Sequence, residues 1–518
     1  MPVDKKNYDQ ELFPLKSWDD YYKSDVSRIF WILAKEDPKK LEEESKHNAL
    51  LFFHQVSSRV PAYKDFLNKN RIVPEKIKTI NDLKQVPWVD KENYLKQYPL
   101  NLLCWDGKIS APIISSSSGS TGDPFFWPRS FKIEMETTFI YELFLRELFE
   151  IDKHKTLLIN GFSLGIYIGG IFTLNCSMRI AQKSYPLTII TPGINKNEIL
   201  NSVEKLHQYY DQIILSGYPP FIRDIIDDGI KRGIDWKKIK LKFYFASESL
   251  SEEFRSYIFD KVGIAEHAYY YSSMNLYGTA DAAIMGHETP LSTFIRKLFS
   301  KNRARCKDYF GTDYVPSLNQ YYPMFKYVET DSGEVILTAF NAEVPLVRYN
   351  IHDKGKVLSY REMIGLAESF NYSETEAEKI TGRHFWHLPY IYLFGRSDFT
   401  VTIYGLNVYP ENIKLALESR ELIDLTTGKF VMETANRPGD QSRYLLIHIE
   451  VLDGIQINKP LIKKFQETII ATLKRVNLEY NHLYQSIKDR ANPEIDLRKQ
   501  GDEKYFSPAT KQQWVRKS

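Results

Sequence analysis

A run of serine, glycine and threonine stands out near residue 120, where the chain reads Ser117-Ser118-Gly119-Ser120-Thr121-Gly122-Asp123-Pro124. Glycine permits backbone angles that other residues disfavour, so successive N–H groups can point at one spot. Together with the hydroxyls, they could surround an anion such as a polyphosphate. The run is not a Walker A loop, because no Gly-Lys-Ser/Thr follows its glycines. A flexible linker can have the same composition, so its meaning depends on the residues downstream.

Four more polar clusters follow in chain order. They are Ala246-Ser247-Glu248, then Asn275-Leu276-Tyr277-Gly278-Thr279-Ala280-Asp281, then Arg348-Tyr349-Asn350-Ile351-His352-Asp353, and finally Gly395-Arg396-Ser397-Asp398 with Gly405-Leu406-Asn407-Val408-Tyr409-Pro410. An ionised carboxylate accepts hydrogen bonds only, which suits a diol. A carboxylate is also a ligand for a hard cation. The clusters therefore offer groups that a nucleotide and its metal ion require.

The elements that must position these clusters alternate between strand and helix. Apolar strand-like runs at 156–160, 187–192, 212–216, 241–245 and 267–272 are separated by helical stretches, which predicts parallel α/β layers. Ligands bind where the strands of such sheets end, and the polar clusters fall there. A helix is predicted over 41–60, a β-rich subdomain over 333–350, and an insertion within 357–394.

The last part of the chain has the pattern of a compact α+β domain. A strand pair over 399–409 is followed by a helix from Pro410, a hairpin around 436–439 and a helix over 460–476. We therefore predict an α/β protein with a large N-terminal domain over 1–395. A hinge over 396–398 and a small mobile α+β domain over 399–518 follow it.

Composition narrows the function classes. The 518 residues are 43% hydrophobic and 26% charged, and the formal net charge is only +3, which argues against a nucleic-acid partner. The three cysteines match no zinc motif and favour a reducing, cytoplasmic location. Residues 156–178 carry no charge and could span a bilayer by length. Polar residues inside this segment favour a buried strand and core helix, so no membrane span is expected.

The five clusters, in this order, resemble the motifs of the adenylate-forming superfamily, which holds acyl-CoA synthetases, luciferases and adenylation domains. The chain looks most like the phenylacetate–CoA ligase branch, and the resemblance covers most of its length. It implies that ATP, with Mg²⁺, activates a carboxylic acid as an acyl-adenylate and that pyrophosphate leaves. The acyl group would then pass to the thiol of coenzyme A.

The resemblance also implies roles for individual residues. The residues expected to bind ATP or AMP are Ser117, Ser118, Gly119, Ser120, Thr121, Gly122, Ser247, Glu248, Asn275, Tyr277, Gly278, Asp353 and Arg396. Among these, Tyr277 would stack on adenine and Asp353 would bind both ribose hydroxyls. Asp281 stands where the family has the glutamate that helps to hold Mg²⁺. The upstream pair Gly382-Arg383 is an alternative to Arg396, which we prefer because Asp398 follows it.

The C-terminal part would supply the moving pieces. Asp398 would be the hinge between the two half-reactions, and Gly405 would lie beside the pantetheine arm of coenzyme A. The expected catalytic lysine is Lys511, because an aromatic-aliphatic pair follows it as in the family's closing strand. Lys504 remains the alternative, since Thr510 replaces the usual glycine before Lys511.

The acid itself is expected to be an aryl or other apolar acid, in a pocket made by Phe162, Tyr167, Tyr218 and Tyr270. Ala280 replaces the threonine that usually precedes the acidic residue. Such departures leave open an acceptor other than coenzyme A, namely an amine or a carrier-protein thiol. They also leave open a catalytically silent nucleotide-binding homologue. The sequence is compatible with a homodimer and does not determine the oligomeric state.

Overall fold

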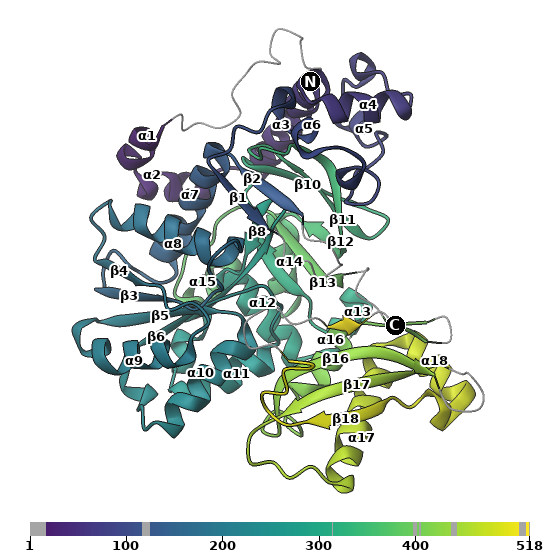
Figure 1. Ribbon diagram of the computed structural model, residues 1–518. Coiled ribbons are helices and arrows are strands. Elements are labelled where there is room, and N and C mark those ends of the chain that lie inside the picture. The colour runs from purple at the N-terminus through teal and green to yellow at the C-terminus, as the bar shows by residue number, and fades with distance from the viewer. Residues whose placement is uncertain are drawn as a thin grey trace.

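The computed structural model describes residues 17–116, 125–312, 314–396, 401–403, 406–436, 443–506 and 514–516. A helical N-terminal region leads into a large mixed sheet with helices on both faces (Figure 1). A smaller unit, yellow-green in Figure 1, lies below this sheet. The predicted α/β fold class is confirmed.

Six helices make up the N-terminal region. They are α1(Trp18–Lys23), α2(Val26–Lys35), α3(Pro38–Arg59), α4(Pro61–Lys69), α5(Ile80–Leu83) and α6(Leu100–Leu103). The longest, α3, begins after Asp37, whose carboxylate accepts a hydrogen bond from the Lys39 backbone N–H at 3.1 Å. It ends at Arg59, and Pro61 then starts α4, because proline fits the first turn of a helix but not its interior. The predicted helix over 41–60 is therefore confirmed.

An eleven-stranded sheet forms the centre of the molecule. In spatial order its strands are β10(Lys326–Asp331), β11(Glu334–Ala339), β12(Leu346–Leu358), β13(Tyr390–Arg396), β9(Ser317–Gln320), β8(Ala283–His287), β7(Ser273–Thr279), β6(Leu241–Ala246), β5(Gln212–Gly217), β3(Thr156–Asn160) and β4(Leu187–Ile190). A separate hairpin pairs β1(Ile113–Ser116) with β2(Phe126–Arg129). The segment from β4 to β7 is parallel. Four predicted strands are confirmed there.

Both faces of the parallel segment are buried, because successive strand residues point to opposite sides. Leu158, Ile214 and Tyr244 pack into one apolar cluster with the first helix after β2. Their neighbours Phe243 and Phe245 pack into another cluster on the other side. The helices involved are α7(Phe131–Glu147), α8(Ile168–Ala181), α9(Lys196–Leu206), α10(Pro219–Lys231), α11(Glu252–Val262), α12(Pro290–Lys301) and α13(Arg303–Phe310).

The strand predicted over 267–272 is wrong. Residues Glu266–Tyr271 form a 3₁₀ helix, and the strand, β7, begins only at Ser273. Periodicity cannot distinguish a short apolar run of this kind from a buried helical turn. The hydroxyl of Tyr269 donates a hydrogen bond to Glu252 on α11 at 2.9 Å, and this bond holds the 3₁₀ turn against that helix.

Two helices occupy the region that the sequence left as an insertion. They are α14(Tyr360–Ser369) and α15(Glu374–Thr381). Each begins with a capping box. The side chain of the N-cap serine accepts a hydrogen bond from the backbone N–H of the glutamate three residues later, and the carboxylate of that glutamate accepts one from the backbone N–H of the serine. The pairs are Ser359 with Glu362, and Ser373 with Glu376.

The C-terminal unit has its own apolar core. A hairpin of β14(Val401–Ile403) and β15(Leu406–Val408) leads to α16(Pro410–Leu417). A four-stranded sheet follows in the order β18(Glu494–Arg498), β17(Arg443–Val451), β16(Thr426–Asn436) and β19(Val515–Arg516), with α17(Lys459–Val476) and α18(Leu478–Ile487). Lys429 joins this unit to the large one through Asp224, at 2.9 Å.

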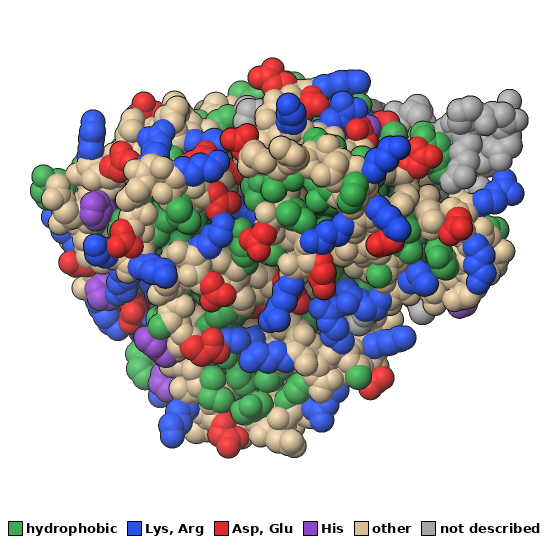
Figure 2. All heavy atoms as spheres, turned by 90° about the horizontal axis from the view of Figure 1, so that it is seen from below, with side chains coloured by type: hydrophobic (Ala, Val, Ile, Leu, Met, Phe, Trp, Pro, Cys, Tyr) green, Lys and Arg blue, Asp and Glu red, His purple; other side chains and the backbone are tan. Residues whose placement is uncertain are grey.

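The surface carries both signs of charge. On the face seen from below in Figure 2, Lys and Arg side chains are interspersed with Asp and Glu side chains. Within the described residues, no helix combines the length and the apolar character needed to cross a bilayer. The uncharged segment 156–178 instead forms the buried strand β3 and, beginning at Ile168, the helix α8.

Candidate active site

The two residues expected to bind adenosine meet in the fold. Tyr277 lies on β7 and Asp353 on β12, and three strands separate these two in the sheet. The Tyr277 hydroxyl nevertheless donates a hydrogen bond to the Asp353 carboxylate. Between the strands that carry these two residues, β8 and β9 pair through His287 and Gln320 alone, so the ladder is narrow at that point.

Buried acceptors without partners gather near this pair. Within the part of the chain that the structure describes, Oδ1 of Asn275, Oε1 of Glu248 and Oε2 of Glu411 have no hydrogen-bond partner. Nδ2 of Asn275 donates to the backbone oxygen of Glu248 at 3.0 Å, so the first two lie side by side. Buried acceptors are normally satisfied. An adenosine would supply N–H and O–H donors for them.

Glu411 was not anticipated from the sequence. The pKa of its carboxyl is raised to about 7, chiefly by burial and also by the nearby charges of Asp353 and Glu248, against the lowering effects of a backbone hydrogen bond and of Lys414. A side chain at Gly395 would collide with it, because a Cβ there would lie 2.4 Å from the carboxyl group. The chain therefore keeps the backbone close to this acid at the junction between the two units.

Ser247 and Glu248 join the site to the C-terminal unit. Ser247 has a φ of 76°, a left-handed conformation that non-glycine residues seldom adopt and that concentrates at functional sites. Oε2 of Glu248 lies 3.2 Å from Nζ of Lys414 on α16. This ion pair holds α16 against the segment after β6 that carries Ser247 and Glu248.

The expected metal ligand, Asp281, is buried in a polar setting. Its Oδ2 accepts a hydrogen bond from the Tyr349 hydroxyl at 2.6 Å, and its Oδ1 lies 3.7 Å from Nζ of Lys91. One carboxylate together with substrate phosphates is a donor set that Mg²⁺ commonly takes. The attraction of Lys91 shows that this carboxylate faces a position where positive charge is favourable. These residues therefore fit a nucleotide-bound Mg²⁺.

A cavity of about 390 Å³ opens beside β7 at the carboxyl ends of β3, β5 and β6. Predicted residues that line it are Phe162, Tyr167, Tyr218, Ser247 and Gly278. Ser116, directly before the serine-rich loop, also lines it. None of the described lining residues is charged. The cavity thus suits the apolar body of a substrate.

Tyr270 does not line this cavity. It is buried in the core cluster on the other face of the sheet, where its ring packs against Tyr269 and Phe294. The 3₁₀ turn that replaced the expected strand directs it there. We therefore leave Tyr270 out of the acid pocket.

Two tyrosines of the cavity wall were missed. The hydroxyls of Tyr141 and Tyr244 are 2.6 Å apart, and that of Tyr141 lies 3.0 Å from the Thr173 hydroxyl. They lie on α7, β6 and α8, so no local pattern joins them. The cavity wall therefore includes a hydrogen-bonded pair of tyrosine hydroxyls beside its aromatic rings.

Several predicted residues lie outside the described part of the chain. These are Ser117, Ser118, Gly119, Ser120, Thr121, Gly122, Asp398, Gly405 and Lys511. Arg396 ends β13, where its backbone pairs with Asp353, and its side chain is likewise outside the description. The roles of these residues stay predictions.

Comparison with known proteins finds relatives of low sequence identity. No model of a protein family matches the chain. It is 21% identical over 392 residues to a phenylacetate–coenzyme A ligase of Thermus thermophilus, which covers 74% of this chain and 76% of that one. A phenylacetate–coenzyme A ligase of Aromatoleum evansii is 21% identical over 366 residues, covering 68% and 70%.

Solved structures extend the likeness to nearly the whole chain. The crystal structure of 2-hydroxyisobutyryl-CoA ligase in the postadenylation state, in complex with 2-HIB-AMP, superposes with a TM-score of 0.63. The two chains are 12% identical, and the match covers 92% of this one and 89% of that one. The chain therefore shares its overall fold with that ligase.

Three residues of this site had no role assigned from the sequence, namely Glu411, Tyr349 and Lys91. Glu411 directly follows the Pro410 of the fifth motif, and Tyr349 lies inside the fourth, so both were within reach of motif analysis. Lys91 gave no signal beyond a short polar loop. Its place beside Asp281 follows from the backbone pairing of Val89 with Tyr349.

Proposed function

We propose that this protein is an ATP-dependent acid–CoA ligase of the phenylacetate–CoA ligase type. In the first step a carboxylate oxygen would attack the α-phosphorus of ATP and pyrophosphate would leave. In the second step the thiol of coenzyme A would attack the acyl carbonyl, form the thioester and release AMP. The observation that carries the proposal is the bond between Tyr277 and Asp353 beside the apolar cavity.

The nucleotide would lie over β7. The ring of Tyr277 would stack on adenine, while Asp353 and Glu411 offer carboxyl oxygens to the ribose hydroxyls and Asn275 offers Oδ1 to the adenine amino group. Fixed, water-poor groups of this kind stabilise developing charge at little reorganisation cost. Asp281 would hold Mg²⁺, which neutralises phosphate charge when bound.

The residues outside the description complete the proposal. The loop 117–122 would bind the phosphates, and Arg396 would contact the ribose or phosphate. Lys511 would bridge the acid and the α-phosphate. The unit over 399–518 would turn about Asp398 and bring Gly405 to the pantetheine arm, so that residues 1–395 serve both half-reactions.

The acid would be aryl or otherwise apolar. The cavity volume of about 390 Å³ lies in the range of small-molecule sites, and aromatic rings such as Phe162 and Phe172 form its wall. Relatives at 21% identity carry the name phenylacetate–coenzyme A ligase, which supports an aryl acid without naming it.

A pyrophosphate–ATP exchange screen over aryl, fatty and amino acids tests the first step. We expect exchange with at least one apolar acid, and acyl-CoA when coenzyme A is added. Amide formed with an added amine, without acyl-CoA, would favour a different acceptor. No exchange with any acid, together with intact ATP binding, would favour a silent homologue.

The lysine assignment has its own test. Lys511→Ala should lower exchange by orders of magnitude while acyl-CoA cleavage in the reverse thioester step is spared. Lys504→Ala is the matched control and should leave exchange nearly unchanged. The opposite result would move the catalytic role to Lys504.

A further inference from the structure

A second cavity lies at the other side of the large sheet, near the ends of the strands that face away from the substrate cavity. Its volume is about 330 Å³, within the range of ligand sites and too large for an ordinary packing void. The loop 148–153, which lines this cavity, comes just before β3, whereas lining residues of the substrate cavity follow that strand. No residue lines both cavities. The second cavity is therefore a separate space.

One wall of this cavity is aromatic. Phe30 and Trp31 come from α2, and Phe385, Trp386 and Tyr390 come from the segment after α15. The rings of Phe30 and Trp386 meet edge to face at 5.7 Å, which fixes both. Trp31 is 53% exposed and forms the rim. This wall can pack against a planar ring.

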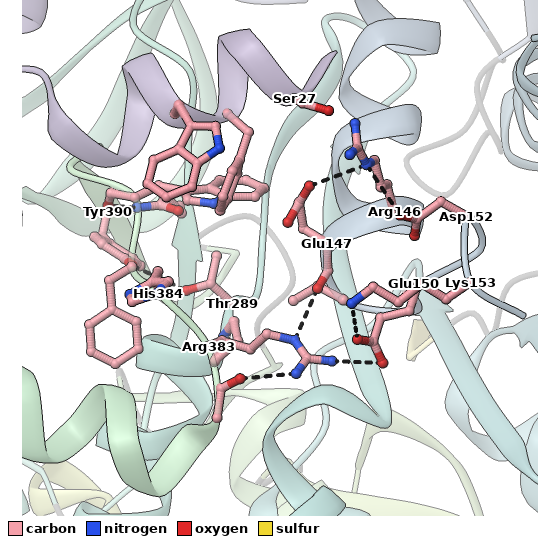
Figure 3. A pocket seen from close by; sticks show the side chains of 18 residues that line it. Ser27, Arg146, Glu147, Glu150, Asp152, Lys153, Thr289, Arg383, His384 and Tyr390 are labelled. Atoms are coloured by element: carbon pink, nitrogen blue, oxygen red, sulfur yellow. Dashed lines mark hydrogen bonds and ion pairs between the residues drawn. The ribbon is translucent and has the colours of Figure 1, made fainter. Parts of the chain in front are cut away.

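The opposite wall is charged. Figure 3 shows Arg146, Asp152 and Lys153 across the cavity from Tyr390 and His384. Arg383 is already used by the protein, since Nε donates to the Glu147 backbone oxygen at 3.1 Å and Nη2 pairs with Glu150 at 3.2 Å. It holds the wall in place rather than awaiting a ligand.

Arg146 and Glu147 differ from Arg383. Among the described residues, the Arg146 side chain has ion pairs only through Nε, which lies 3.7 Å from both Glu147 and Asp152, beyond hydrogen-bond length. Its planar fork is suited to a carboxylate bound through two parallel bonds. Burial raises the pKa of the neighbouring Glu147 carboxyl, so a cation placed beside it would be favourable.

Gln320 supplies an independent sign of a ligand. It lines the cavity and is only 1% exposed. Its amide nitrogen, Nε2, donates to the backbone oxygens of Trp386 and Leu388, at 2.8 and 3.1 Å, which fixes the orientation of the amide group. Its Oε1 has no hydrogen-bond partner among the described residues. A buried acceptor of this kind calls for a donor from a ligand.

We propose that this cavity binds a small aromatic zwitterion of the aromatic α-amino acid class. The ligand carboxylate binds the Arg146 fork, its ammonium binds Glu147, and its ring packs on the aromatic wall. Three basic and three acidic side chains line the cavity, so a net-neutral ligand matches it better than a simple anion. The basic members are Arg146, Lys153 and Arg383, and the acidic ones are Glu147, Glu150 and Asp152.

Calorimetric titration of the full chain with L-phenylalanine tests the proposal without ATP. We expect one site with a Kd of about 1 mM or below, as suits a ligand of this size. Arg146→Gln and Glu147→Gln should each weaken binding about tenfold or more, because each removes a charge-assisted hydrogen bond. Arg28→Gln is the matched control, since Arg28 is exposed on α2, which also carries Phe30 and Trp31, and does not line the cavity.

N-acetyl-L-phenylalanine, which lacks the ammonium, separates this site from a plain acid site. Its affinity should change less than about twofold in Glu147→Gln, because it has no ammonium for Glu147 to bind. Three results would overturn the proposal: no L-phenylalanine binding at high concentration, binding that neither variant weakens, or equal Glu147 sensitivity for both ligands. Glu147→Gln keeps the side-chain shape, so it carries the test if Arg146→Gln unfolds.

Discussion

Replacing Asp353 by asparagine tests the nucleotide site most directly. The carboxylate is 8% exposed and accepts a hydrogen bond from Tyr277, which leaves further lone pairs for the two ribose hydroxyls. Asparagine keeps the shape, loses the charge and has one acceptor oxygen instead of two. The variant should therefore lose at least one charge-assisted hydrogen bond to the nucleotide.

A hydrogen bond to a charged group contributes about 1.5–3 kcal/mol, so the Kd for ATP should rise about 10- to 150-fold. Calorimetry or equilibrium dialysis with ATP and Mg²⁺ measures the change. Tyr277→Phe is the control, because it keeps the ring for stacking and loses only the hydroxyl that binds Asp353. Its effect should stay below about tenfold.

Repeating the titrations with 2′-deoxy-ATP completes a cycle that isolates the ribose contact. The wild type should prefer ATP over the deoxy nucleotide, and Asp353→Asn should lose most of that preference. Unchanged ATP affinity in a folded Asp353→Asn protein would refute the ribose role. Full retention of the preference for ATP would refute it as well.

Three further predictions concern other parts of the structure. Glu411 has a folded-state pKa of about 7, above its ordinary 4.5, so its contribution to stability is present at low pH and is lost as pH rises through 7. In urea unfolding, the free energy of unfolding of Glu411→Gln should rise by about 2–3 kcal/mol relative to that of the wild type between pH 5 and pH 8. A difference that stays constant over this pH range would contradict the prediction. Glu288→Gln should lower the free energy of unfolding by about 3–5 kcal/mol, because it leaves the buried Arg255 and Arg296 with less compensating charge. A loss below about 1 kcal/mol would show that the ion pairs of Glu288 with these two arginines are dispensable. Tyr244→Phe should reduce kcat/KM about tenfold only for acids with a hydroxyl group remote from the carboxylate, and equal losses for plain acids would disprove a specificity role.

Local signals predicted the elements well where one mechanism dominated. The end of α3 follows from Pro61, which cannot continue a helix interior. Strands β3, β5 and β6 follow from short apolar runs between helical stretches. The capping pairs Ser359 with Glu362 and Ser373 with Glu376 are also visible in the sequence, yet the region around them was predicted only as an insertion, with no elements assigned to it.

Local signals failed where distant groups set the outcome. Whether residues 266–271 form a strand or a 3₁₀ turn depends on the bond from Tyr269 to Glu252, which lies 17 residues away. The same turn sends Tyr270 into the core instead of the substrate cavity. Side-chain contacts of this kind are invisible to any pattern of period 2 or 3.6.

The sequence by itself determined the α/β class and the order of the polar clusters, because apolar periodicity and turn residues act over a few neighbours. Only the tertiary structure decided that Tyr277 bonds to Asp353, since they lie on β7 and β12, which three other strands separate in the sheet. It also decided that Lys91 faces Asp281, and that Arg146 and Trp31 share a cavity. Such contacts join segments far apart in the chain, so packing of the whole molecule fixes them.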